Sequence, residues 1–280
     1  MKLITWNIQS CKGCDGRIDA RRIVEHARAL ADFDVLCLQE VSDGFPPLDG
    51  GVDQFAQLAA LLPAFSAIPG IALDMQAPDG RRARFGNLVL SRLPVAHALR
   101  HALPQPLDAA ARSMPRMMLE ATLLTDAGPL RVMTTHLEYH SGTQRAAQAD
   151  AILHAHANAC DQARRPAPAA PPSSPYGGTP HTASAILTGD FNFASDDPLH
   201  AALQQPHGPH VPRFADAWQR RYPGTAQPHT VGLYDHAQWP DSFACDFVYV
   251  TEDLVQRIDR IEIDTVTQAS DHQPMLVILN

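Results

Sequence analysis

The sequence predicts an α/β (α+β) fold in which helices cover β-sheets. Short β-rich runs alternate with helical patterns along the whole chain, which is typical of layered α/β architecture. The chain has 280 residues, of which 45% are hydrophobic and 19% charged, a globular composition with ample material for a core. It contains no visible repeat and no apolar run long enough to cross a bilayer. We therefore expect residues 1–280 to form a single domain.

Three strands and two helices are predicted in the first third of the chain. Leu3–Ile8 is a strand-like run, and Ala20–Ala31 carries apolar residues on one side at helical spacing. Val35–Leu38 is entirely apolar, as expected of a buried strand. Gln54–Leu62 is helical up to the proline that follows it, and Asn87–Leu90 is a further short strand.

The remainder of the chain continues the alternation. Met117–Thr125 and Leu130–His136 flank a turn that contains glycine and proline, so a hairpin is predicted. The Ala- and Gln-rich segment Thr143–Ala159 is predicted to be a helix, and Ala185–Thr188 a buried strand. Three further strands are predicted at Phe247–Val250, Ile258–Asp264 and Met275–Leu279.

The segment Arg164–Thr182 differs from its surroundings because it is rich in proline. Repeated prolines remove backbone donors and block a helix, and this composition cannot pack a core. Since the chemically interesting residues lie on both sides of it, we interpret it as an exposed loop within the domain rather than a linker. A scaffold protein that docks a partner on Pro171–Pro175 as polyproline II is the alternative.

Charge and cysteine content limit the classes of function. The net charge of −8 and the pI of about 5.9 make tight, nonspecific binding of duplex DNA less favourable, because such binding depends on phosphate neutralisation. Five scattered cysteines argue against a disulfide framework, and the pair Cys11 and Cys14 has no second pair to complete a zinc site. The N-terminus lacks the features of a signal peptide, so a cytoplasmic location is expected.

Polar side chains occur where the predicted buried strands begin or end. In α/β sheets, ligand sites form at such positions because loops from several strands converge there. Each residue alone could be a turn former, a helix cap or a hydrogen-bonded strand-end residue. Taken together, they include several carboxylates, which repel one another unless a cation lies between them. A hard divalent cation is suited to carboxylate and amide oxygens as ligands. The set comprises Asn7, Glu40, His136, Asp190, Asn192, Asp271 and His272.

Seven short segments, in order from residue 5 to residue 272, resemble the motifs of the endonuclease/exonuclease/phosphatase superfamily. This superfamily includes DNase I-like nucleases, repair endonucleases, neutral sphingomyelinases and inositol polyphosphate phosphatases. The matching segments are Thr5-Trp6-Asn7-Ile8, Leu38-Gln39-Glu40-Val41, Gly86-Asn87-Leu88-Val89-Leu90-Ser91, Thr134-Thr135-His136-Leu137, Gly189-Asp190-Phe191-Asn192, Cys245-Asp246-Phe247-Val248-Tyr249-Val250 and Ser270-Asp271-His272.

The resemblance implies a fold and a metal site. The fold would be a four-layer α/β/β/α sandwich of the DNase I type, in which two mixed sheets pack face to face with helices outside. Glu40 would bind Mg²⁺ or Mn²⁺, with Asn7 and Asp271 close to the ion and its waters. Some members carry an acid two residues after the first asparagine, where this chain has Gln9. One ion is therefore expected rather than two.

The resemblance also implies catalytic roles. Asp190 would take the proton from the attacking water, and Asn192 would orient that water or the phosphate. Asp246 would hold His272, which would contact the phosphate. His136 would approach the phosphate from another side, to stabilise charge or to assist the leaving oxygen. A metal ion and two imidazoles aimed at the phosphate oxygens suit a reaction that develops charge there.

Contacts to the rest of the substrate are predicted only from position. Arg116 directly precedes a strand and could reach a phosphate, although a surface ion pair is an equal alternative. Tyr139, His140 and Arg145 follow the strand that ends at His136 and could line the cleft. Trp239 lies in an aromatic- and His-rich loop and could stack on a base or pack in the interior.

The sequence thus predicts a Mg²⁺- or Mn²⁺-dependent hydrolase of phosphate esters, with phosphodiesters preferred and nucleic acid among the substrates considered. Segments around residues 8–10 and 41–43 depart from the pattern of repair endonucleases, so abasic-site cleavage is not favoured. The alternatives are a catalytically inactive binding module of the same fold, and a phosphomonoesterase or sphingomyelinase-like enzyme acting on a small or lipid substrate. No obligate protein partner is indicated.

Overall fold

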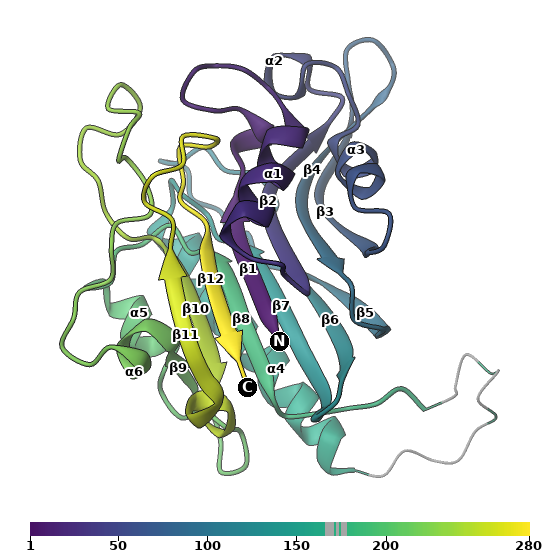
Figure 1. Cartoon of the computed structure of the whole chain (residues 1–280), viewed down its shortest axis with the longest axis vertical. Coiled ribbons are helices and arrows are strands. Elements are labelled where there is room, and N and C mark those ends of the chain that lie inside the picture. Colours follow the sequence, from purple (N-terminus) through teal and green to yellow (C-terminus); the bar gives the residue numbers. More distant parts are fainter. Residues whose placement is uncertain (166–170, 172–173, 175–177) are drawn as a thin grey trace.

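The computed structural model describes residues 1–165, 171, 174 and 178–280, which form two six-stranded sheets packed face to face with helices outside (Figure 1). The first sheet has the order β11-β12-β1-β2-β4-β3, and the second β5-β6-β7-β8-β10-β9. The first consists of β1 (Lys2–Asn7), β2 (Val35–Asp43), β3 (Ser66–Gln76), β4 (Arg82–Ser91), β11 (Ile258–Ile263) and β12 (Met275–Leu279). The second consists of β5 (Val95–Ala102), β6 (Met117–Thr125), β7 (Gly128–His136), β8 (Ala185–Asp190), β9 (Phe214–Asp216) and β10 (Asp246–Thr251).

The helices cover the outer faces of the sheets, which confirms the predicted α/β sandwich. The longer helices are α1 (Ala20–Leu30), α3 (Gln54–Leu61) and α4 (Gly142–Arg164), and the shorter ones are α2 (Pro46–Asp49), α5 (Pro198–Ala202), α6 (Ala217–Arg221) and the 3₁₀ helices η1 (Gln9–Cys11) and η2 (Glu252–Arg257). Helix α1 lies against the sheet that contains β1 and β2, and α4 lies against the other sheet (Figure 1). Among the described residues, no helix combines the length and apolar character needed to span a membrane.

Strand residues alternate between the central core and the outer layers. Leu3 and Val35 belong to the cluster between the two sheets, whereas Ile4 and Leu36 pack in the cluster that includes α1. The same alternation holds in β8, where Ile186 faces the other sheet and Leu187 faces the α4 side. Strands covered on both faces are apolar along their whole length, and this explains why they read as uninterrupted apolar runs in the sequence.

The topology brings the polar strand ends to one edge of the sandwich. β1 and β2 are parallel neighbours with Asn7 opposite Gln39, and β7 and β8 are parallel neighbours with His136 opposite Asp190. Parallel neighbours end at the same edge of a sheet. β10 and β12 run antiparallel to β8 and β1, so their starting residues reach this edge as well, with Asp246 opposite Asp190. A polar cluster at this edge follows from the connectivity.

Several element boundaries differ from the prediction. β2 does not end at Leu38 but continues to Asp43, with a register shift between Leu38 and Val41. Glu40 sits in this irregularity with φ of 58°, a conformation uncommon outside glycine and asparagine. The sequence did not predict β3, β5 and β9, because β3 and β5 are edge strands with broken apolar patterns and β9 has only three residues.

The predicted proline-rich loop at 164–182 lies partly outside the described residues, and with it part of the suggested docking segment Pro171–Pro175. The predicted end of the preceding helix at Ala159 was wrong, because α4 continues through Arg164. At the end of the predicted loop, the carbonyl oxygen of Thr182 accepts a hydrogen bond of 3.0 Å from Arg131 Nε.

A buried polar group joins α4 to the second sheet. His156 Nε2 lies 2.8 Å from the carbonyl oxygen of Pro212, and its Nδ1 faces Arg131 Nη2. The guanidinium also lies 3.6 Å from Glu120. A neutral imidazole that donates from Nε2 and accepts at Nδ1 satisfies both neighbours. Burial, followed by the charge of Arg131, lowers the pKa of His156 to about 4.

We expect His156 to make the fold acid-sensitive. Its folded-state pKa lies below its ordinary value of 6.5, so protons favour the unfolded chain as pH falls from 6.5 to about 4, and roughly 3 kcal/mol of stability is lost over this window. Denaturant unfolding of wild type and His156→Gln between pH 7 and pH 4 measures this contribution. The stability advantage of wild type should shrink on acidification, whereas His154→Gln, an exposed substitution on the same helix, should follow wild type. A constant advantage across the pH range would contradict the assignment.

Candidate active site

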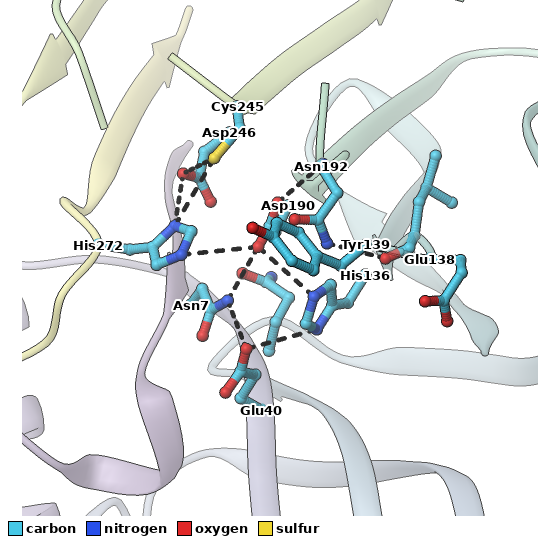
Figure 2. Close-up of polar contacts among 12 residues, drawn as sticks. Asn7, Glu40, His136, Glu138, Tyr139, Asp190, Asn192, Cys245, Asp246 and His272 are labelled. Atoms are coloured by element: carbon cyan, nitrogen blue, oxygen red, sulfur yellow. Dashed lines mark hydrogen bonds and ion pairs between the residues drawn. The ribbon is translucent and has the colours of Figure 1, made fainter. Parts of the chain in front are cut away.

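A cleft of about 610 Å³ opens at the edge where the parallel strand pairs end. Of the predicted catalytic and metal-binding residues, six line it directly, and Asn7 and Asp246 contact these six from behind. Figure 2 shows the side chains of all of these residues except Asp271, which converge from both sheets. The six lining residues are Glu40, His136, Asp190, Asn192, Asp271 and His272.

Asp190 occupies the centre of the cluster, at the end of β8. Its Oδ2 accepts a hydrogen bond of 2.9 Å from Asn7 Nδ2 and lies 3.5 Å from His136 Nε2 and 3.7 Å from His272 Nε2. Its Oδ1 accepts the backbone N–H of Asn192 at 2.9 Å. Burial raises the pKa of Asp190 to about 6, opposed by the charge of His272. A carboxylate in this position can accept a proton near neutral pH.

The turn after Asp190 is built around Asn192. This residue has φ of 54°, which asparagine adopts more readily than other side chains do. Its Nδ2 donates to the carbonyl oxygen of Leu137 at 2.9 Å, which joins the ends of β7 and β8. The turn therefore holds His136 and Asp190 in a fixed relation.

His272 is held by Asp246, as the sequence predicts. The distance from His272 Nδ1 to Asp246 Oδ2 is 2.9 Å, and both side chains are buried. Burial by itself lowers the pKa of His272, but the surrounding carboxylates, with Asp246 foremost, raise it well above the ordinary value. The imidazole is thus protonated, with its Nε2 directed toward Asp190 and the cleft (Figure 2).

We expect Asp246→Asn to lower kcat by about 10²-fold or more, because the variant no longer fixes the orientation and charge of His272. The measurement is steady-state kinetics with thermal unfolding on the same samples. Asp216→Asn is the matched control, since Asp216 forms an equally buried pair with His200 at 2.8 Å away from the cleft. If both variants lose the same fraction of activity, the loss reflects the fold rather than the position of His272.

Glu40 projects into the cleft from the irregularity in β2. Its Oε1 accepts a hydrogen bond of 3.0 Å from Asn7 Nδ2 and lies 3.9 Å from His136 Nδ1. Although 26% of the side chain is exposed, burial of the carboxylate deep in the cleft, followed by the charge of Asp271, raises the pKa of Glu40 to about 7. A cation beside Glu40 would relieve this repulsion between carboxylates, so the residues present fit a hard divalent ion.

The Asp271 carboxylate is surrounded by donors. Its Oδ2 accepts from Gln9 Nε2 at 2.9 Å, from Gln238 Nε2 at 3.1 Å and from Trp239 Nε1 at 3.1 Å. Ser270 Oγ lies 3.3 Å from its other oxygen. Gln9, which stands where some relatives carry an acid, therefore acts as a donor that positions Asp271.

Asp190, Cys245 and His272 form a second group whose ligand atoms lie within 4.8 Å of one another. This group suits a metal ion poorly. Burial, and then the charge of Asp190, raises the pKa of the Cys245 thiol well above its ordinary value. The protonated thiol instead donates to Asp246 Oδ2 over 3.5 Å. Glu40 is thus the better anchor for a cation.

His136 differs from His272 in charge. Burial, then the positive charges of Arg116 and His272, lowers its pKa well below the ordinary value. His136 is therefore neutral at neutral pH and can donate or accept one hydrogen bond at each ring nitrogen. Its Nδ1 is buried and has no hydrogen-bond partner among the described residues.

Four of the five predicted substrate contacts line the cleft. The rings of Tyr139 and Trp239 meet edge to face with centroids 5.7 Å apart. Arg116 is buried and pairs through Nε with Glu138 at 3.2 Å, while its Nη1 has no partner among the described residues. His140 accepts a hydrogen bond of 3.0 Å from Arg112 Nε.

Arg145, the fifth, does not line the cleft. Its Nη1 donates to the carbonyl oxygens of Glu138 and Tyr139 at 2.8 and 3.0 Å. It therefore supports the loop that carries Tyr139 instead of contacting a ligand, because its charge is directed at backbone acceptors.

Sequence reasoning did not single out several residues that line the cleft. They come from loops, from the short helices η1 and α2, and from parts of β3 and β4 outside the predicted strands, and they carry no motif by which they could have been found. These residues are Ser10, Lys12, Phe45, Leu48, Leu73, Phe85, Arg112, Met114 and Gln238.

Comparison with known proteins agrees with this geometry. The sequence model of the Endonuclease/Exonuclease/phosphatase family matches residues 4–272. A solved endonuclease/exonuclease/phosphatase from Beutenbergia cavernae is 23% identical, with a TM-score of 0.68 over 100% of this chain and 72% of that one. A mannosyl-6-phosphatase from Bacteroides thetaiotaomicron is 16% identical, with a TM-score of 0.68 over 100% and 99% of the two chains. The human nocturnin catalytic domain is 15% identical, with a TM-score of 0.64 over 100% and 93%. Among curated protein sequences, none matches this chain.

Proposed function

The chain belongs to the endonuclease/exonuclease/phosphatase family, and we propose that it is a Mg²⁺- or Mn²⁺-dependent phosphoesterase that prefers phosphodiesters. One observation carries the proposal. Asp190 lies within 4 Å of two imidazole nitrogens, 3.5 Å from His136 and 3.7 Å from His272, and Asn7 connects it to Glu40. One cleft thus contains a candidate base, two imidazoles that can contact a phosphate, and a carboxylate that can bind a cation.

The roles of the chain's own groups follow from their charges. Asp190, whose pKa is raised to about 6, takes the proton of a water that attacks the phosphorus atom. Protonated His272 donates from Nε2 to a nonbridging phosphate oxygen, and neutral His136 donates to another phosphate oxygen or to the leaving oxygen. Asn192, whose backbone N–H donates to Asp190, would orient that water or the phosphate.

Glu40, with Asn7 and Asp271 nearby, would hold one divalent ion. When bound, this ion would neutralise charge that develops on the phosphate oxygens. Asp271 would act with its position fixed by Gln9 and Trp239. The alternative of an inactive binding module has less support, because six of the eight predicted catalytic and metal-binding residues line a single cleft and the other two contact these six.

A substrate panel tests the proposal. We expect wild type to hydrolyse bis-p-nitrophenyl phosphate in Mg²⁺ or Mn²⁺ faster than p-nitrophenyl phosphate, which would establish a diesterase. Single- and double-stranded DNA, RNA and sphingomyelin complete the panel. The reverse preference would make the enzyme a phosphomonoesterase, and an absence of turnover on every compound with either ion would contradict the proposal.

A further inference from the structure

One side of the cleft is an apolar wall, which we define as Phe45, Leu48, Leu73, Phe85 and Met114. Leu73 on β3 and Phe85 on β4 stand directly opposite each other in the antiparallel register, where side chains on one face are in contact. Phe45 and Leu48 come from the segment that follows β2 and forms α2. Two strands, the α2 segment and the loop that carries Met114 therefore contribute to this surface.

Four of the five residues of the apolar wall are at least partly exposed, and only Phe85 is buried. Leu48 is 46% exposed, and Leu73 is partly exposed. None of the three core clusters formed by described residues includes Leu73, Phe85 or Met114. Apolar side chains that line a cleft leave part of their surface in water, and an apolar ligand group would remove that surface from water.

The apolar wall adjoins the catalytic residues. Phe85 and Met114 border a narrow cavity that also reaches Arg116 and His136. A phosphate held beside His136 and Asp190 would consequently have the wall next to one of its ester oxygens. The wall is thus placed to receive the organic group attached to the reacting phosphate.

The charges around the cleft do not favour an extended polyanion. Its lining contains four cationic side chains, Lys12, Arg112, Arg116 and the protonated His272, and three acidic ones, Glu40, Asp190 and Asp271. Proteins that bind nucleic acid without sequence preference follow the backbone with an excess of basic side chains. The cationic side chains at the cleft exceed the acidic ones by only one, and the whole chain carries −8.

We propose that the substrate is a small phosphate ester with an apolar alkyl or aryl group, and that the apolar wall binds this group while the phosphate lies at Asp190 and His272. The inference rests on the proposed function, because it assigns the phosphate to the same catalytic centre. It narrows the substrate class from any phosphate ester to those with an apolar organic group.

Binding of n-alkylphosphonates, which cannot be hydrolysed as esters, tests this inference. Dissociation constants for ethyl- to hexylphosphonate, all monomeric in solution, are measured by calorimetry with wild type in Mg²⁺. Burial of one methylene against a one-sided wall should tighten binding about twofold, and full enclosure about fourfold. The double variant Leu48→Asn/Leu73→Asn should lose most of this chain-length dependence.

Leu124→Asn is the matched control, because Leu124 is similarly exposed at 43% but lies beside the β6–β7 turn, outside the cleft. It should retain the wild-type dependence on chain length. Equal binding of all phosphonates to wild type, no binding at all, or a chain-length dependence that survives in the double variant would overturn the inference. Calorimetry does not require turnover, so failure of the proposed function would appear separately, as a lack of hydrolysis of bis-p-nitrophenyl phosphate.

Discussion

Asp190→Asn is expected to lower kcat by about 10²- to 10⁴-fold, the range attributed to a positioned general base. An amide cannot accept the proton of the attacking water, and none of the neighbouring groups replaces it. His272 is protonated, and His136 is engaged with the phosphate in the proposed arrangement. The measurement is kcat with bis-p-nitrophenyl phosphate at saturating metal.

The same substitution should change stability little. The variant loses one of the two hydrogen bonds that Asp190 accepts, from Asn7 or from the Asn192 N–H, together with its attraction to His272, but it also removes one negative charge from the vicinity of Glu40 and Asp246. These effects have opposite signs, so we expect the thermal midpoint to stay close to that of wild type. Asp150→Asn, an exposed substitution on α4, controls for the loss of charge. A variant that keeps near-normal turnover would show that another group is the base.

Removal of the metal is expected to abolish turnover. Burial, followed by the charge of Asp271, raises the pKa of Glu40 to about 7, and a cation beside Glu40 would favour its ionised form. EDTA should therefore stop hydrolysis, and added Mg²⁺ or Mn²⁺ should restore it. Glu40→Gln should require far higher metal concentrations, because an amide oxygen is a weaker ligand than a carboxylate.

Thermal unfolding provides a readout of metal binding that does not depend on activity. An ion at 100 times its Kd stabilises the folded state by about 2.7 kcal/mol, which should raise the Tm of wild type by roughly 5 °C. Glu40→Gln should show a much smaller rise, whereas Glu25→Gln, an exposed substitution on α1, should behave as wild type. If Mg²⁺ and Mn²⁺ shift Glu40→Gln as much as wild type, the ion binds elsewhere.

Much of the fold and most of the catalytic set could be predicted from the sequence. Strands covered on both faces are apolar along their length, so Val35–Leu38 and Ala185–Thr188 could be recognised directly. Polar residues at the ends of such strands indicated the catalytic edge, since parallel neighbours must end together. Asn7, His136 and Asp190 illustrate this, because each is the last residue of a strand in a parallel pair.

The edge strands and the irregularity in β2 could not be predicted in this way. β3 faces solvent over much of its length and contains proline and glycine, so it lacks the apolar continuity of a central strand. The left-handed conformation of Glu40 depends on how β2 pairs with β4 after the register shift. Such backbone geometry is decided by packing between strands, and no local residue pattern encodes it.

The sequence by itself determined which polar residues lie at the edge of the sandwich, because these residues stand at the ends of strands that the apolar pattern reveals. Only the tertiary structure decided which further side chains line or support the cleft. Trp239 and Gln9 both donate hydrogen bonds to Asp271, although they lie 32 and 262 residues from it in the sequence. Arg145 donates to backbone carbonyl oxygens instead of lining the cleft. The apolar wall likewise depends on β3, which the sequence does not reveal. Contacts between residues far apart in the chain arise from how strands and loops pack, and the spacing of residues in the sequence does not predict them.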